Sequence, residues 1–112
     1  MGSKLKNAGS SDQQPFFHIA LQEGFNKDEV HIEHNDKSIY QKNTVTSDLR
    51  IGLADSLEVP QLAGQNTIKF ILPKKRIEQS ITFQYSSTVY LAVSLVGDEL
   101  RVLVSDGAFG YL

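Results

Sequence analysis

Three histidines, His18, His31 and His34, fall within seventeen positions and lie close to several carboxylates. Neutral imidazole and carboxylate groups are ligands for zinc and similar ions. On a strand, His31 and Glu33 share a face, whereas His31 and His34 point to opposite faces. Neither the His-Glu-x-x-His motif nor the paired histidines of a cupin occur. The pattern therefore favours ordinary surface or turn histidines and no cofactor. A metal site built from His18, His31 and Glu33 is the alternative.

Paired carboxylates could carry out acid–base chemistry such as glycoside hydrolysis, which needs two carboxyl groups about 5–9 Å apart. The candidates are Asp55, Glu58, Glu78, Asp98 and Asp106. Only Asp55 lies at an inward position of the predicted strands, and an inward Asp more often caps a bulge amide or protects a sheet edge. No Gly-x-Ser-x-Gly elbow occurs, and Ser86-Ser87-Thr88 is typical of a turn. The sequence therefore predicts no catalytic residues and no enzyme.

The basic run Lys74-Lys75-Arg76 follows Pro73 and is the one cationic cluster. It lacks the interleaved aromatic residues of single-strand nucleic-acid binders, and the net charge of the chain is only −2. There is no overall field to gather nucleic acid or an anionic membrane. The pattern favours a solvated turn, with an anion or partner contact at Lys74, Lys75 and Arg76 as the alternative.

Aromatic residues are the remaining candidates for binding. Tyr40 and Tyr90 lie at outward positions of the predicted strands, Phe25 in a loop and Tyr111 near the end of the sequence. Outward rings on a sheet can stack on sugars or anchor a protein partner, although tyrosine also packs over its cross-strand neighbours. The chain has no Trp, which weakens the sugar-binding version. These four residues are the predicted ligand-binding set.

The composition is that of one globular domain. The chain has 112 residues, of which 40% are hydrophobic and 21% charged, and it contains no Cys. Disulfides, thiol catalysis and thiolate metal sites are thus excluded, whereas secreted, periplasmic and cytoplasmic locations are all compatible. No apolar stretch reaches the 18 residues of a membrane-spanning helix. We expect a flexible leader over residues 1–14 and a single domain over 15–112.

Apolar residues recur every second position, which predicts strands rather than helices. The segments with this period are 16–21, 29–34, 37–42, 49–59, 68–72, 77–85, 89–95 and 100–104. Turn residues separate them at spacings near ten residues, which is typical of a sandwich or small barrel.

Two tight turns fix the expected pairing of their strands. A two-residue loop at Asn35-Asp36 predicts the pairs His34 with Lys37, Ile32 with Ile39, His31 with Tyr40 and Glu29 with Lys42. A two-residue loop at Gly97-Asp98 predicts the pairs Leu95 with Leu100, Val93 with Val102 and Leu91 with Val104.

Together these signals predict an all-β fold, an antiparallel β-sandwich of about eight short strands that is immunoglobulin-like or jelly-roll-like. The paired Cys and core Trp of immunoglobulin domains are both missing. We expect a non-catalytic interaction module that binds a protein or glycan through a sheet face or end loops. The alternatives are a small metal-binding protein or metal-dependent enzyme, and a structural subunit that self-assembles through exposed sheet edges.

Overall fold

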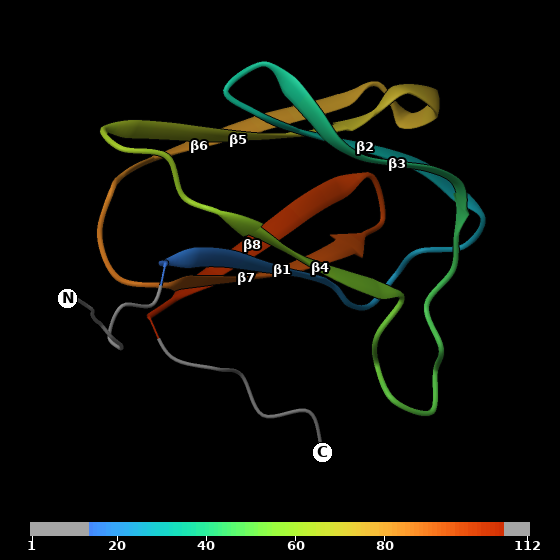
Figure 1. Ribbon diagram of the computed structural model, residues 1–112. Helices are drawn as coiled ribbons and strands as arrows, with labels where there is room; N and C mark the ends of the chain where they lie inside the picture. Colours follow the sequence, from blue (N-terminus) through green and yellow to red (C-terminus); the bar gives the residue numbers. More distant parts are fainter. Residues whose placement is uncertain (1–13, 107–112) are drawn as a thin grey trace, which may run out of the picture.

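The computed structural model describes residues 14–106, which form eight strands and one short 3₁₀ turn (Figure 1). The predicted leader, apart from Gln14, and Tyr111 lie outside these residues. The strands are β1 (Phe16–Leu21), β2 (Asp28–His34), β3 (Lys37–Val45), β4 (Asp55–Pro60), β5 (Gln65–Leu72), β6 (Ile77–Gln84), β7 (Val89–Val96) and β8 (Glu99–Ser105), and the turn η1 spans Pro73–Lys75.

The strands form two four-stranded sheets that pack against each other, so the predicted all-β sandwich is confirmed. The first sheet has the order β4-β1-β7-β8 and the second the order β3-β2-β5-β6. In Figure 1 the second sheet lies above the first. Among the described residues no helix is long and apolar enough to cross a bilayer.

The core comes from alternate positions of the central strands. Phe17, Ile19 and Leu21 of β1 are fully buried, as are Ile68 and Phe70 of β5. Because successive side chains of a strand point to opposite faces, the residues between them form the outer faces of the sandwich.

One pairing departs from the antiparallel pattern. β1 lies between β4, to which it is antiparallel, and β7, to which it is parallel. The amide of Phe16 also donates a hydrogen bond to the Thr88 hydroxyl, across 72 positions of sequence. A parallel neighbour distant in sequence leaves no local signal, because only antiparallel strands can be joined by a tight turn.

The hairpin at Gly97-Asp98 has the predicted register. Leu95 pairs with Leu100, Val93 with Val102 and Leu91 with Val104, with no irregularity along the pair. Gly97 has a φ of +64°, which a tight hairpin turn requires and glycine adopts without strain.

The hairpin at Asn35-Asp36 has the predicted turn but a different register. His34 pairs with Lys37 as expected, whereas Ile32 pairs with Tyr40 and not with Ile39. A bulge supplies the extra residue. It turns Tyr40 toward the space between the sheets, where the ring packs against the core. The predicted pairs of His31 with Tyr40 and of Glu29 with Lys42 are therefore wrong by one position. Instead, His31 pairs with Gln41, and Lys42 pairs with Val30.

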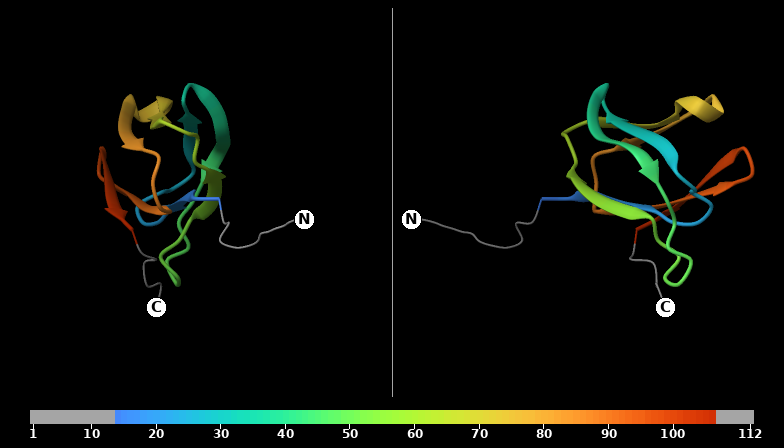
Figure 2. Two further views of the ribbon diagram at one scale, coloured as in Figure 1. Left: turned by 60° about the vertical axis from the view of Figure 1, so that its left-hand side comes forward. Right: turned by 90° about the vertical axis from the view of Figure 1, so that its right-hand side faces the viewer.

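The predicted strand over 49–59 is wrong in its first half, because β4 begins at Asp55. The carboxylate of Asp48 accepts a hydrogen bond from the Arg50 amide at 3.0 Å. The Asp48 carbonyl accepts bonds from the amides of Ile51 and Gly52. These local bonds satisfy the backbone without a partner strand. The result is a loop that projects beyond the sheets between β3 and β4 (Figure 2).

Candidate functional site

The three histidines lie apart from one another in the sandwich. His18 is between core residues of β1 and His31 is between core residues of β2, so each points outward from its own sheet. Both sheets therefore separate His18 from His31 and Glu33. His34 is buried. Within residues 14–106 no group of three or more His, Asp or Glu side chains could hold a metal ion.

Asp55, the inward carboxylate of the sequence prediction, joins the two sheets along one side. Its Oδ2 accepts a hydrogen bond from the Tyr40 hydroxyl at 2.7 Å and lies 3.5 Å from Nζ of Lys42. Burial acts to raise the pKa of Asp55, but the bonds from Tyr40 and the Ser56 amide and the charge of Lys42 outweigh it and lower the pKa. Burial, reinforced by Asp55, raises the pKa of Tyr40. This cluster holds the β3 and β4 edges together.

The cluster predicts an acid-sensitive contribution to stability. Since the pKa of Asp55 is lower in the folded chain, its contribution is present above the unfolded-state value of about 3.9 and is lost as the pH falls through the folded-state value. From about pH 5 to about pH 3, we expect urea denaturation to show a smaller loss for Asp55→Asn than for the unaltered chain. The difference should be about 1 kcal/mol or less, because the side chain is a third exposed. Equal losses in the two proteins would contradict this assignment.

The basic run forms a surface turn. Pro73–Lys75 is the 3₁₀ turn, and Arg76 follows it with a φ of +57°. Nζ of Lys75 lies 3.8 Å from the Asp28 carboxylate. Lys74 and Arg76 are exposed, whereas Lys75 is half-buried beside its acidic partner.

The described members of the predicted aromatic set, Phe25, Tyr40 and Tyr90, do not form one surface. Phe25 is buried, with 3% of its surface exposed, and belongs to the core. Tyr40 lies against the core beside Asp55. Tyr90 alone among the described members keeps its outward position, on β7 of the first sheet. Its ring packs against His18, with the two centroids 5.5 Å apart.

The outer face of the second sheet is polar and internally paired. Nζ of Lys69 lies 3.9 Å from Glu33 and 4.0 Å from Glu78. The hydroxyls of Thr67 and Thr82 lie 3.0 Å apart. Long-range register brings these residues together on β2, β5 and β6. The polar side chains of this face are paired with one another and are compatible with exposure to solvent.

The outer face of the first sheet has a different character. One row runs across it from Glu58 through His18 to Tyr90, and Nδ1 of His18 lies 3.1 Å from Oε2 of Glu58. The next row comprises Ser56, Ala20, Ala92 and Leu103. The small side chains of its two alanines extend less far from the sheet than the rings of His18 and Tyr90 in the first row. Leu103, at the end of this second row, is 65% exposed.

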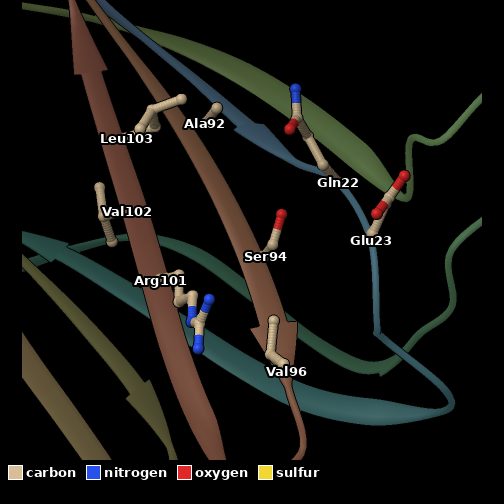
Figure 3. A pocket seen from close by; sticks show the side chains of 8 residues that line it. All are labelled: Gln22, Glu23, Ala92, Ser94, Val96, Arg101, Val102 and Leu103. Atoms are coloured by element: carbon tan, nitrogen blue, oxygen red, sulfur yellow. The ribbon is translucent and has the colours of Figure 1, made fainter.

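A hollow lies on this face beside β7 and β8, and we call it the β7–β8 hollow (Figure 3). Its lining residues are Gln22, Glu23, Ala92, Ser94, Val96, Arg101, Val102 and Leu103. Figure 3 shows Gln22 and Glu23 beyond the end of β1, on one side of the hollow, and β8 on the other. The volume of about 290 Å³ is at the lower limit for small-molecule pockets. It suits one side chain of a larger partner.

The lining of the hollow combines apolar and charged groups. Val96 and Leu103 are 50% and 65% exposed. The Arg101 guanidinium donates to Glu99 at 3.2 Å, so its charge is balanced within β8, and Glu23 carries a negative charge on the opposite side. An apolar centre within a polar rim is the usual anatomy of a protein interface.

A second exposed apolar feature is the tip of the β3–β4 loop. Leu49 and Ile51 are 91% and 59% exposed, on either side of Arg50. The Asp48 carboxylate pairs with Arg50, and hydrogen bonds from Arg50 lower the pKa of Asp48. Sequence periodicity assigned these residues to a strand. The sequence feature that could have predicted a loop here is the pair of turn-forming residues Asp48 and Gly52.

The chain matches no protein-family model and no curated protein.

Proposed function

We propose that the chain is a non-catalytic interaction module that binds a protein partner through the outer face of the first sheet, with an apolar side chain of the partner seated in the β7–β8 hollow. The observation that supports this function most directly is the contrast between the two outer faces. Lys69 of the second sheet is paired with acidic neighbours, whereas Val96 and Leu103 of the first sheet expose half or more of their surface. Interfaces are anchored by apolar side chains that fill such pockets.

The side chains around the hollow favour a protein over a glycan. Its exposed apolar groups, Val96 and Leu103, are aliphatic and cannot stack on a sugar ring as an aromatic face does. Tyr90, in the neighbouring part of the face, is half-buried and already packs against His18. The polar rim formed by Gln22, Glu23 and Arg101 would pair with polar groups of a peptide backbone or side chains.

Filling the hollow should weaken binding. The Ala92 side chain points into the hollow, so Ala92→Arg places a long charged side chain where the partner's apolar group would sit. Ala92 is only 5% exposed, so Ser94→Arg, at a half-buried position, tests the same wall with less disturbance of the sheet. We expect the unaltered chain to select peptides with a shared apolar residue from a phage-displayed random library. Calorimetry with a selected synthetic peptide should show at least about tenfold weaker binding to Ala92→Arg, or about 1.4 kcal/mol.

The matched control is Ser80→Arg, which introduces the same side chain at an exposed position of β6 on the second sheet and should bind as the unaltered chain does. Ser94→Arg, on the same wall as Ala92, is a second blocking variant. Selection of no peptide class, or equal binding by both blocking variants and the control, would overturn the proposal. So would glycan-array binding that Tyr90→Ala abolishes and Ala92→Arg leaves intact.

A further inference from the structure

Four strands of the sandwich lie at sheet edges: β4 and β8 in the first sheet, β3 and β6 in the second. An edge strand presents a row of backbone amide and carbonyl groups that can pair with another chain, and proteins protect such edges with bulges, prolines, charges or covering side chains. How each edge is protected therefore indicates which one is left for a partner.

Two of the four edges, β3 and β4, carry such protection, and a third, β6, is mostly polar. β3 has two irregularities in its pairing with β2 and carries Lys37 and Lys42. β4 ends in Pro60, which has no amide hydrogen, and Tyr40 of β3 lies across its other end at Asp55. β6 has polar residues at five of its eight positions, Glu78, Gln79, Ser80, Thr82 and Gln84.

β8 carries two charges, Glu99 and Arg101, near its first end, but its centre has no bulge, proline or charge. Its pairing with β7 is regular over all seven residues, and within residues 14–106 it has a strand neighbour on one side only. The consecutive residues Val102, Leu103 and Val104 occupy its centre. Leu103 on the outer face and Val104 on the inner face are 65% and 50% exposed. Both faces of this edge thus carry apolar surface in contact with water.

Hairpin geometry identifies the backbone groups that point away from β7. Val96 and Glu99 flank the two-residue loop and therefore form a hydrogen-bonded pair. From this pair onward, hydrogen-bonded and non-hydrogen-bonded pairs alternate along the two strands. The amides and carbonyls of Leu100, Val102 and Val104 therefore point toward the open edge. Such groups are complementary to a β-strand.

We infer that the occupant of this edge is a second copy of the chain, whose β8 pairs antiparallel with the first so that Leu103 faces Leu103 across a two-fold axis. In this register Val102 of each copy faces Val104 of the other. Apolar residues therefore meet apolar residues on both faces of the pair. The chain is its own complement at this edge, as a two-fold interface requires.

The charges of β8 select this register over the alternative centred on Val102. That alternative would place Arg101 of one copy opposite Leu103 of the other and bring the two guanidinium groups close together diagonally. Pairing about Leu103 separates them. The bond between Arg101 and Glu99 within each copy also leaves little net charge on the outer face to oppose association. A single pair of edge strands buries less area than stable interfaces, so we expect a weak, concentration-dependent dimer.

The inference goes beyond the proposed function, and Leu103 belongs to both the hollow and the edge of β8. Ala92→Arg separates the two, because it blocks the hollow from β7 without changing the edge of β8. If both hold, the dimer joins two first sheets into one eight-stranded sheet with two β7–β8 hollows on the same outer face. A partner carrying two copies of its anchoring segment would then bind more tightly than a partner carrying one.

Cysteine cross-linking tests the register directly, because the chain contains no Cys. Leu103 would face its counterpart as a non-hydrogen-bonded pair with Cα atoms about 4.5 Å apart, within the range that a disulfide spans. Under mild oxidation we expect Leu103→Cys to form a disulfide-linked dimer. The matched control is Arg101→Cys, on the same strand and face, whose counterparts would lie roughly 14 Å apart along the strand and should stay monomeric.

Sedimentation velocity provides the measurement without cross-linking. The mean mass of the unaltered chain should rise with concentration, and Leu103→Asp, which places two carboxylates face to face, should stay monomeric. Val104→Asp is a second variant with the same expected effect, at another exposed position of the strand. Cross-linking of Leu103→Cys no more extensive than that of Arg101→Cys would overturn the inference.

Discussion

Replacing Gly24 with alanine is expected to remove at least about 4 kcal/mol from the free energy of unfolding. An added Cβ would lie 1.7 Å from the carbonyl oxygen of Leu95 and 2.7 Å from its carbonyl carbon. Both are backbone atoms of β7, so no side chain can rotate away to make room. The amide of Leu95 also donates to the Glu23 carbonyl at 2.8 Å, which holds the two segments together at this point. Relief therefore requires moving the β1–β2 loop off the sheet.

Gly64→Ala is the matched control for this substitution. Gly64 has a φ of +85°, close to the +91° of Gly24, but an added Cβ would meet no atom within 4 Å. Its cost should be the conformational strain alone, about 1–2 kcal/mol. Urea denaturation of the two variants measures the difference. Similar costs would show that backbone conformation, rather than the close approach to Leu95, decides the requirement for glycine at position 24.

Asn66→Ala is expected to lower the free energy of unfolding by about 3 kcal/mol or more, because it leaves several buried groups without partners. Asn66 is fully buried. Its Nδ2 donates to the carbonyls of Leu62 and Gly64, and its Oδ1 accepts from the Leu62 amide at 2.8 Å. Nε2 of the buried His34 lies 2.7 Å from the same oxygen. Since that oxygen is an acceptor, His34 donates its Nε2 hydrogen.

The control for Asn66 is Asn43→Ala, an exposed position on β3, which should change stability by less than about 0.5 kcal/mol. Chemical denaturation gives both values, and the one-dimensional proton spectrum reports whether the β4–β5 loop keeps its order. A loss at Asn66 as small as that at Asn43 would mean that water replaces the side-chain bonds. The buried amide would then not be a structural requirement.

The sequence predicted the elements whose pairing is local. The β7–β8 hairpin could be derived completely because Leu91, Val93 and Leu95 alternate up to a two-residue loop, and slippage by one position would expose all of them. The same reasoning located the Asn35-Asp36 turn. That reasoning did not predict the bulge in β3, because the bulge is stabilised by contacts distant in sequence. The one-residue shift places Tyr40 against the core and lets its hydroxyl donate a hydrogen bond to the Asp55 carboxylate.

The false strand shows where periodicity misleads. Leu49, Ile51 and Leu53 alternate as strand residues do, yet the carboxylate of Asp48 and the positive φ of Gly52 stabilise a turn. Three alternating apolar residues can also occur in a loop, because the alternation does not show whether the backbone is hydrogen-bonded to a neighbouring strand or to a local side chain.

The candidate site was predictable only in part. Tyr90 was identified as an outward residue, but its neighbours on the surface, His18 and Glu58, come from β1 and β4. Their position beside Tyr90 depends on the placement of β1 between two strands distant in sequence. The hollow likewise depends on Ala92, a residue type that carries no functional signal by itself. The small side chain of Ala92 leaves space for the hollow only because larger residues of β8 and of the segment after β1 surround it.

The parallel contact of β1 with β7 has a consequence for biosynthesis. On the ribosome, β2, β3, β5 and β6 can join soon after each emerges, since their partners lie close along the nascent chain. β1 emerges before any of them but gains its second neighbour only after residue 89 and beyond have left the exit tunnel. The backbone groups of β1 on that edge therefore stay without their strand partner until the last hairpin has emerged. We expect this open edge, during that interval, to be a site where the unfinished chain can pair wrongly with another strand.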